Sequence, residues 1–211
     1  MERSPLAGDL DGILARTPRL WDGLRGARVF ITGGTGFFGT WLLESLLHAD
    51  RALGLGAKAL VLTRDEAAFR AKAPHLAADR RLEFLRGDVR TFAFPPGGFT
   101  HVVHAATEAS VRLNQEQPEL MRDEIVSGTR RTLKFTEQCG AKKFLLASSG
   151  AVYGRQRPDV ERVAEDDPGF DAPLETPSAY AEGKRLAESL CVEAAGRSLD
   201  ATIARGFAFV G

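Results

Sequence analysis

The stretch ARVFITGGTGFFG, residues 27–39, decides the fold. Its first six residues form a short apolar run with β-branched side chains, which is typical of a buried strand. Glycines follow at once at positions 33, 36 and 39, and apolar residues then recur at helical spacing. A strand, a glycine-rich turn and a helix in this order can hold a pyrophosphate, because the start of the helix presents unpaired N–H groups to an anion.

Each glycine of the turn has an expected role. Gly33 makes the tight turn, Gly36 lets the backbone approach the phosphates, and Gly39 lets the helix pack closely on the sheet. The alternative is a flexible turn with incidental glycines, which would not explain why strand, loop and helix agree. We therefore predict a dinucleotide site here, to which the neighbouring residues of the loop also contribute: Thr35, Phe37 and Phe38.

Further apolar runs alternate with helical patterns along the rest of the chain. Strands are predicted at residues 58–63, 82–86, 102–105, 144–147 and 201–204, and helices at 38–53, 65–78, 118–138 and 178–195. This alternation implies right-handed crossovers and a parallel sheet covered on both faces. The predicted fold class is α/β, a doubly wound parallel sheet of the Rossmann type. A proline-containing, acidic loop at 155–177 follows a strand, a position where long loops are often functional.

Composition narrows the function classes. The chain has 211 residues, and its 28 Lys and Arg balance its 28 Asp and Glu, so it has no basic footprint for nucleic acid or for a membrane surface. No stretch is apolar enough to span a membrane, and the two cysteines have neither disulfide-framework nor metal-ligand spacing. We expect no metal, a cytoplasmic location, an amphipathic lead-in at residues 1–25 and a dinucleotide-binding domain at 26–211.

The end of the second predicted strand bears on the choice of dinucleotide. An acidic residue there would accept hydrogen bonds from the adenosine ribose and repel a 2′-phosphate. This chain instead has Thr63 followed by Arg64, and a guanidinium favours a 2′-phosphate. Asp65 can cap the next helix, although it can also reach the ribose. We expect an NAD(P) site that favours NADP over NAD.

Together with the glycine loop, four later motifs resemble those of the extended short-chain dehydrogenase/reductases, also called the NAD-dependent epimerase/dehydratase family. They follow successive predicted strands or open the last long helix: Gly87-Asp88-Val89-Arg90, His104-Ala105-Ala106-Thr107, Ser148-Ser149-Gly150-Ala151-Val152-Tyr153-Gly154, and Tyr180-Ala181-Glu182-Gly183-Lys184. The resemblance covers about residues 26–211. It implies a nucleotide-sugar substrate and an NAD(P) cofactor.

The resemblance also assigns roles to single residues. It places Asp88 and Val89 at the adenine end of the cofactor, and Ala105, Ala106 and Thr107 close beside it. Tyr180 and Lys184 would be the catalytic acid/base pair and would also contact the cofactor. Ser149 would bind the substrate oxygen, with Ser148 as the alternative.

The chemistry of the pair can also be argued from its spacing. At i and i+4, Tyr180 and Lys184 share one face of a helix. Tyr180 lies in the first turns of that helix, where the helix dipole stabilises an anion. A nearby ammonium adds to this effect, so the phenol can exchange a proton with substrate while hydride moves to or from nicotinamide.

Departures from the family pattern put the substrate in doubt. Gly150 and Ala151 stand where the sugar 4,6-dehydratases carry an Asp-Glu pair, so dehydration by that mechanism is not expected. Family members continue beyond the point that corresponds to Gly211, so we expect most of the C-terminal substrate lobe to be truncated here. One hypothesis is a nucleotide-sugar epimerase- or reductase-type enzyme. The other is a cofactor-binding module without turnover.

The resemblance further suggests a homodimer built on the two long helices before and after the fifth strand. Six apolar residues on these helices are candidates for this interface: Leu120, Ile125, Leu133, Phe135, Leu186 and Leu190. The alternative is that they only cover the sheet.

Overall fold

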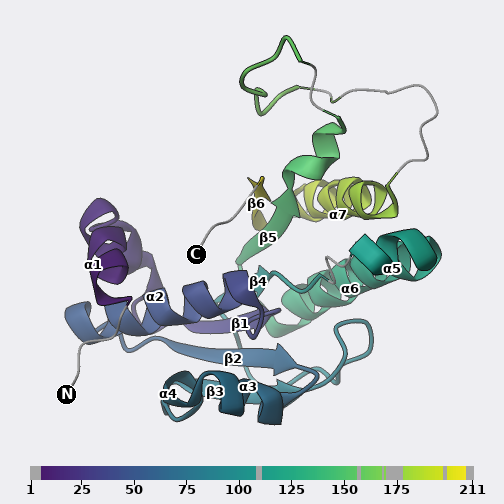
Figure 1. Cartoon of the computed structure of the whole chain (residues 1–211). Coiled ribbons are helices and arrows are strands. Elements are labelled where there is room, and N and C mark those ends of the chain that lie inside the picture. The colour runs from purple at the N-terminus through teal and green to yellow at the C-terminus, as the bar shows by residue number, and fades with distance from the viewer. Residues whose placement is uncertain are drawn as a thin grey trace.

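A computed structural model of the chain describes residues 6–107, 111–155, 158–167, 169, 178–196 and 199–207. Within this part of the chain, six strands form one sheet in the order β3-β2-β1-β4-β5-β6, and every neighbouring pair is parallel. The chain winds outward from β1 in both directions, which is the doubly wound Rossmann topology (Figure 1). The predicted fold class is therefore confirmed.

The strands lie close to their predicted positions. Their bounds are β1 (Arg28–Thr32), β2 (Lys58–Thr63), β3 (Leu82–Arg86), β4 (His101–His104), β5 (Lys143–Ser149) and β6 (Asp200–Gly206). The strands β5 and β6 extend further at both ends than their apolar cores indicate, because their mutual register pairs polar residues from Lys143↔Asp200 to Ser149↔Gly206. This longer pairing carries the Ser149 end of β5 to the edge of the sheet where the motifs gather.

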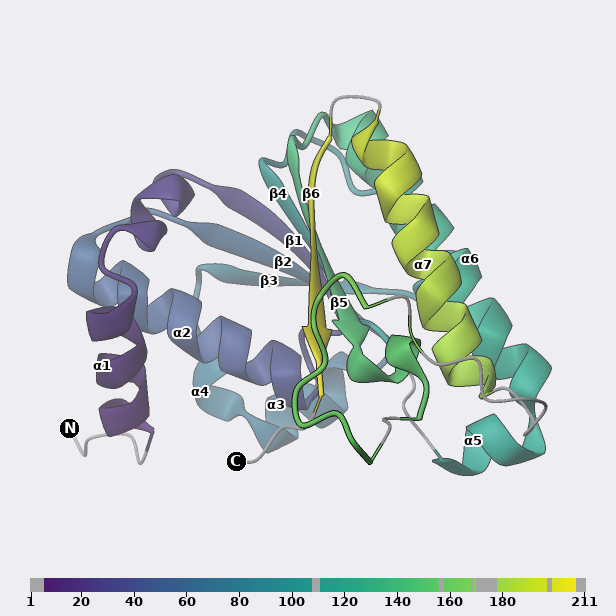
Figure 2. The same ribbon diagram turned by 90° about the horizontal axis from the view of Figure 1, so that it is seen from above.

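Helices cover both faces of the sheet (Figure 2). Their bounds are α1 (Ala7–Arg16), α2 (Phe37–Leu53), α3 (Glu66–Lys72), α4 (Pro74–Ala77), α5 (Val111–Glu116), α6 (Pro118–Cys139) and α7 (Ala179–Ala195), with short 3₁₀ turns η1 (Leu20–Leu24) and η2 (Gly150–Tyr153). Alternate residues of β1 enter opposite cores: Val29 and Ile31 pack with α2, α3 and α4, whereas Phe30 packs with α6 and α7. The three central residues of the strand are apolar because both of its faces are buried.

The predicted helix at 65–78 is wrong in one respect, since the segment forms two short helices, α3 and α4. Ala73 lies between them with φ −136° and ψ 64°, outside the helical region, and Pro74 opens α4. Proline lacks the N–H for the helix ladder and disfavours helical geometry in the residue before it. The short helix α5 is an addition that the sequence pattern did not predict.

The predicted lead-in is mostly helical. Leu10 of α1 is buried, and His48 of α2 lies 3.0 Å from Asp11 of α1. Residues 1–5 and parts of the acidic loop, 156–157, 168 and 170–177, lie outside the described residues. Among the described helices, none combines the length and hydropathy that a membrane crossing requires.

Two of the six candidate residues for a dimer interface are buried within the protomer and cannot contact a second copy of the chain. Ile125 and Phe135 are 2% and 1% exposed and belong to the core between the sheet and the helices α6 and α7. Leu186 points outward from α7, with 48% of its surface exposed. The apolar pattern of α6 thus reflects contact with the sheet at these two positions.

Candidate functional site

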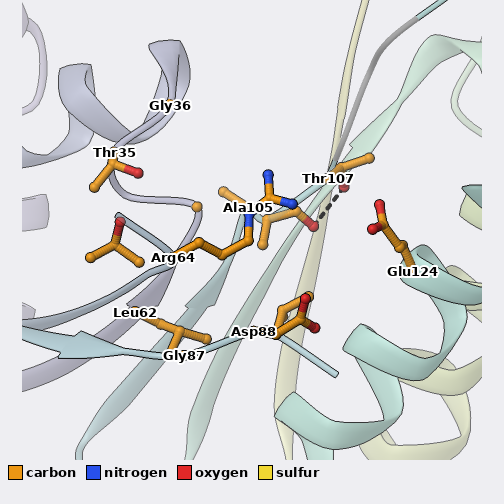
Figure 3. Close-up of a pocket in the computed structure, with 13 residues that line it drawn as sticks. Thr35, Gly36, Leu62, Arg64, Gly87, Asp88, Ala105, Thr107 and Glu124 are labelled. Atoms are coloured by element: carbon orange, nitrogen blue, oxygen red, sulfur yellow. Dashed lines mark hydrogen bonds between the residues drawn. The ribbon is translucent and has the colours of Figure 1, made fainter. Parts of the chain in front are cut away.

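A pocket opens at the carboxyl edge of the central strands, where the predicted motifs converge (Figure 3). Its volume is about 210 Å³. Residues predicted to bind cofactor make up most of the lining: Gly33, Thr35, Gly36, Thr63, Arg64, Asp88, Val89, Ala105, Ala106 and Thr107. Leu62, Gly87 and Glu124 also line it and were not predicted. The remaining predicted contacts, Phe37, Phe38, Gly39, Tyr180 and Lys184, lie outside this lining.

Gly33 is required at the turn for two reasons. Its φ of +71° falls in the left-handed region that disfavours side chains. In addition, a Cβ at this position would lie 2.5 Å from both Ala105 O and Ala106 N. The turn and the close approach of the β4 loop therefore both depend on glycine.

The other two glycines of the motif differ sharply in their surroundings. At Gly36, the N-cap of α2, a Cβ would meet only Gly33 O, at 3.4 Å, and the residue faces the pocket. At Gly39 a Cβ would overlap Gly33 O and the Gly34 backbone. The nearest atoms to Gly39 thus belong to the loop itself and not to the sheet against which we expected it to pack. Gly36 thus leaves open space at the start of α2, and Gly39 lets the loop fold against its own helix.

The residues after β2 are arranged as the sequence suggested. The Asp65 carboxylate accepts a hydrogen bond from Ala68 N–H (2.9 Å), so it caps α3. The Thr63 hydroxyl accepts one from Asp65 N–H (3.3 Å). The Arg64 side chain extends into the pocket (Figure 3). A cation therefore lines this part of the site, while the neighbouring carboxylate is used for capping.

Asp88 is held by an arginine that was not singled out as a site residue. Arg90 donates from Nε and Nη2 to the two carboxylate oxygens (2.9 and 3.1 Å), and its backbone N–H donates to the first of them (2.8 Å). These bonds hold the pKa of Asp88 below its usual value. Arg90 Nη2 also lies 3.9 Å from Glu124, which α6 brings to the far side of the pocket. Asp88 is thus an ionised, fixed acceptor.

Lys184 is buried behind the pocket, with 3% of its surface exposed. Its ammonium donates to Thr107 Oγ1 (2.8 Å) and to Ala147 O (2.7 Å). Burial lowers its pKa to about 8, while the charge of Glu188 acts in the opposite direction. Thr107 lines the pocket and contacts Lys184, so it connects the pocket to the predicted catalytic pair.

Tyr180 is half-buried at the start of α7, and Lys184 Nζ lies 5.7 Å from the centre of its ring. The Asn114 side chain of α5 accepts a hydrogen bond from Tyr180 N–H (3.0 Å). Ser178 caps the same helix by accepting from Ala181 N–H (3.4 Å). The start of this helix is therefore fixed by two side chains, of which Asn114 carries no local sequence signal.

The two adjacent serines at the end of β5 have different surroundings. Ser148 is buried and donates its hydroxyl proton to Glu188 (2.5 Å). Ser149 is half-buried, and its oxygen accepts a hydrogen bond from Ala151 N–H (3.2 Å). The Ser148 proton is therefore engaged by Glu188, whereas Ser149 acts here as an acceptor.

His104 connects the ends of the central strands. Its ring nitrogens lie 2.7 Å from Thr32 Oγ1 and 3.1 Å from Thr129 Oγ1. Complete burial lowers its pKa to about 3, so the imidazole is neutral at physiological pH. Its role is to join β1, β4 and α6. In the described part of the chain, no three His, Cys, Asp or Glu side chains gather as a metal site.

Known families and proteins match the part of the chain that carries the motifs described above. The model of the NAD dependent epimerase/dehydratase family matches residues 29–211. A UDP-glucuronate 4-epimerase from Thermodesulfobacterium geofontis is 30% identical over 165 residues, which are 76% of this chain and 49% of that protein. UDP-glucuronic acid decarboxylase 1 from Arabidopsis thaliana is 30% identical over 188 residues, or 88% and 40% of the two chains.

Among solved structures, the dTDP-glucose 4,6-dehydratase DesIV from Streptomyces venezuelae, with NAD and TYD bound, superposes with a TM-score of 0.70. It is 26% identical, and the match covers 84% of this chain and 55% of that one. The chain spans about half the length of the curated relatives it matches.

Proposed function

The chain belongs to the NAD-dependent epimerase/dehydratase family, and from that premise we propose that it binds NAD(P) and transfers hydride at a carbon of a nucleotide-sugar. The observation that carries the proposal is the hydrogen bond between Lys184 and Thr107. It joins the predicted acid/base helix to the pocket that the glycine loop forms.

The residues present suit a dinucleotide. Gly36 leaves room at the start of α2, where N–H groups and the helix dipole favour a pyrophosphate. Asp88 offers an ionised acceptor at the adenine end, and small residues at 105 and 106 leave space beside β4. When bound, the nicotinamide supplies the acceptor or donor of hydride.

The roles of the protein side chains follow from their positions. Tyr180 takes the proton of the sugar hydroxyl as hydride leaves the same carbon, and returns it in the reverse step. The Lys184 ammonium favours the ionised form of the phenol. Ser149 donates a hydrogen bond to the substrate oxygen and fixes its orientation. Oxidation followed by re-reduction gives epimerisation, and reduction alone gives a reductase.

Dehydration by a neighbouring acid/base pair is disfavoured. Gly150 and Ala151 carry no proton-transferring side chain. A Cβ at Gly150 would also lie 2.5 Å from the Phe207 ring, so a larger side chain there requires this ring to move. We therefore favour epimerisation or reduction over 4,6-dehydration.

We further propose that NADP binds more tightly than NAD, supported by Arg64 in the pocket and by Asp65 being used as a helix cap. Charge-assisted hydrogen bonds to a 2′-phosphate are worth about 1.5–3 kcal/mol, or about ten- to a hundredfold in affinity. Calorimetric titration of both dinucleotides should show this preference, and Arg64→Ala should abolish it. A wild type that binds NAD at least as tightly as NADP would refute the assignment of Arg64.

Tyr180→Phe tests the proposed reaction. The variant should bind dinucleotide as the wild type does but lose conversion of nucleotide-sugars, measured across a panel by chromatography. Retained turnover would show that Tyr180 is not the acid/base. Dinucleotide binding without any turnover by the wild type would instead support a second candidate, a cofactor-binding module.

Two further expectations complete the proposal. A homodimer would use the outward face of α7 around Leu186 and Leu190, and light scattering at micromolar concentration should give twice the monomer mass. A monomeric mass would count against it. A reducing, cytoplasmic location is supported by the two free thiols, Cys139 and Cys191.

A further inference from the structure

Glu188 is a buried carboxylate that the proposed reaction does not use. Only 8% of its surface is exposed. It lies on α7 one turn beyond Lys184 and two turns beyond Tyr180, so the three side chains form a column along one face of the helix. A buried carboxylate requires partners, and the partners of Glu188 come from two other elements.

Both carboxylate oxygens of Glu188 are engaged. Ser148, at the end of β5, donates its hydroxyl proton to Oε1 (2.5 Å). Arg205, on β6, donates from Nε to Oε1 (3.0 Å) and from Nη2 to Oε2 (2.7 Å). Such bidentate arginine–carboxylate pairs have a defined geometry as well as a favourable energy. Glu188 therefore connects α7 to the ends of two neighbouring strands.

Arg205 extends the same network toward the loops beside the site. Its Nη1 donates to the Tyr153 hydroxyl (2.7 Å) and to the Glu165 backbone carbonyl (2.8 Å). Its guanidinium also lies 4.8 Å from the centre of the Tyr153 ring. Tyr153 ends η2, the turn that begins directly after Ser149. One arginine thus holds the turn after Ser149 and part of the acidic segment.

We propose that Glu188 and Arg205 are positioning residues, a buried carboxylate and a partly buried guanidinium that together fix the Ser149 end of β5 and the turn η2 relative to the Tyr180–Lys184 face of α7. This inference rests on the proposed function for its catalytic meaning. Whether the pair holds Ser149 in place relative to α7 can be measured without any substrate.

A purely stabilising role explains the pair less well. The pair should contribute little net stability compared with apolar residues of similar size, because the Glu188 carboxylate loses its hydration and solvent screens the Arg205 side chain, which is 30% exposed. Removing one partner alone is strongly unfavourable, however, since it leaves a buried charge unpaired. The main effect of the pair is therefore to fix the positions of Ser148, Arg205 and Tyr153, and not to stabilise the fold.

The charge of Glu188 also reaches Lys184. It raises the pKa of the ammonium and so opposes the effect of burial. The other groups that face Lys184 are the Tyr180 ring, whose centre lies 5.7 Å from Nζ, the neutral His104 and Thr107, and the Cys191 thiol, whose pKa burial raises to about 12. All of them are present in both variants compared below. Loss of the carboxylate should thus shift the titration of Lys184 downward.

The test compares Glu188→Gln with Glu182→Gln in the whole chain. Glu182 lies on the same helix and pairs with Arg122 (2.7 Å) at a more exposed position, so it controls for the loss of one ion pair from α7. Hydrogen exchange reports on the Ala151 amide, which Ser149 caps. Carbon-13 NMR of lysine side chains reports the titration midpoint of Lys184.

In Glu188→Gln we expect exchange at Ala151 to rise about tenfold and the Lys184 midpoint to fall by at least about half a pH unit. Where the wild type turns over substrate, kcat should fall about ten- to a hundredfold with the dinucleotide Kd unchanged. Glu182→Gln should behave as the wild type in all three measurements.

If Glu188→Gln matches Glu182→Gln in both exchange and titration, the inference is overturned, whatever the activity. If Glu188→Gln fails to fold, Arg205→Lys takes its place, because it keeps the charge but cannot make all of the arginine's bonds. It should increase exchange at Ala151, and wild-type exchange would overturn the inference. Turnover absent from the wild type would refute the proposed function while leaving the exchange and titration results decisive for this pair.

Discussion

Replacing glycine by alanine should affect different properties of the protein at Gly36 and at Gly39, which lie one helical turn apart. At Gly36 a methyl group meets only Gly33 O, at 3.4 Å, and otherwise enters the pocket. At Gly39 it overlaps the Gly33 carbonyl and the Gly34 backbone. Gly36→Ala should therefore impair binding, and Gly39→Ala should impair folding.

The magnitudes follow from the local geometry. Alanine in a helix interior is favoured over glycine by about 0.5–1 kcal/mol, but overpacking against backbone costs about 1–3 kcal/mol or more. Gly39→Ala should thus lower the free energy of unfolding by about 1–2 kcal/mol. Gly36→Ala should lower it by less than about 1 kcal/mol, the N-cap difference between glycine and alanine.

Urea unfolding and calorimetric titration with NADP measure the two effects separately. Gly36→Ala should weaken NADP binding at least about tenfold, equivalent to 1.4 kcal/mol, since its methyl group occupies the approach to the pyrophosphate. The reasoning fails if Gly36→Ala binds NADP as tightly as the wild type, or if Gly39→Ala unfolds at the wild-type urea concentration.

Three other substitutions test the surroundings of the site. The pKa of Lys184 is lowered to about 8 from 10.5, so the unfolded chain binds more protons between these pH values and stability should rise with pH there. Relative to Lys184→Met, urea unfolding should show the wild type gaining up to about 3 kcal/mol across this window, whereas parallel pH profiles would contradict the burial of its charge. In the native chain, Cys139 should react with a thiol reagent. Cys191 should react only after the chain unfolds, because it is fully buried and burial raises its pKa to about 12. Labelling of the native Cys139→Ser variant, which retains Cys191, would disprove this. Asn114→Ala removes the acceptor of Tyr180 N–H and should cost about 0.5–2 kcal/mol of stability, and an unchanged unfolding curve would show that this cap is not formed.

Local patterns predicted the parts of the molecule that local forces determine. The loop at 33–39 and the strand at 58–63 could be located because glycine spacing and a short apolar run are visible within a few residues. Pro74 was equally visible, yet the alanine-rich pattern around it suggested one helix where proline produces two. A predicted helix should therefore be ended before a proline in its interior, because proline has no N–H to donate to the carbonyl four residues earlier.

The remaining features depend on contacts between distant segments. Glu124 enters the pocket only because α6 crosses the sheet, and Glu188 meets Arg205 only because β6 pairs with β5. Ile125 and Phe135 carry the apolar character expected of an interface, and the three-dimensional packing places them in the core. Periodicity shows that a residue is buried but not which surface buries it.

The most direct test of the account is to map NADP binding on the backbone amides of the chain by NMR. The account predicts saturable shifts centred on Gly33, Thr35, Gly36, Asp88 and Thr107, which line one pocket at the carboxyl edge of the sheet. Amides around Lys134 and Leu190, in the separate groove between α6 and α7, should not move. Shifts centred on that groove, or none at all, would contradict the central claim that the pocket of Figure 3 is a dinucleotide site.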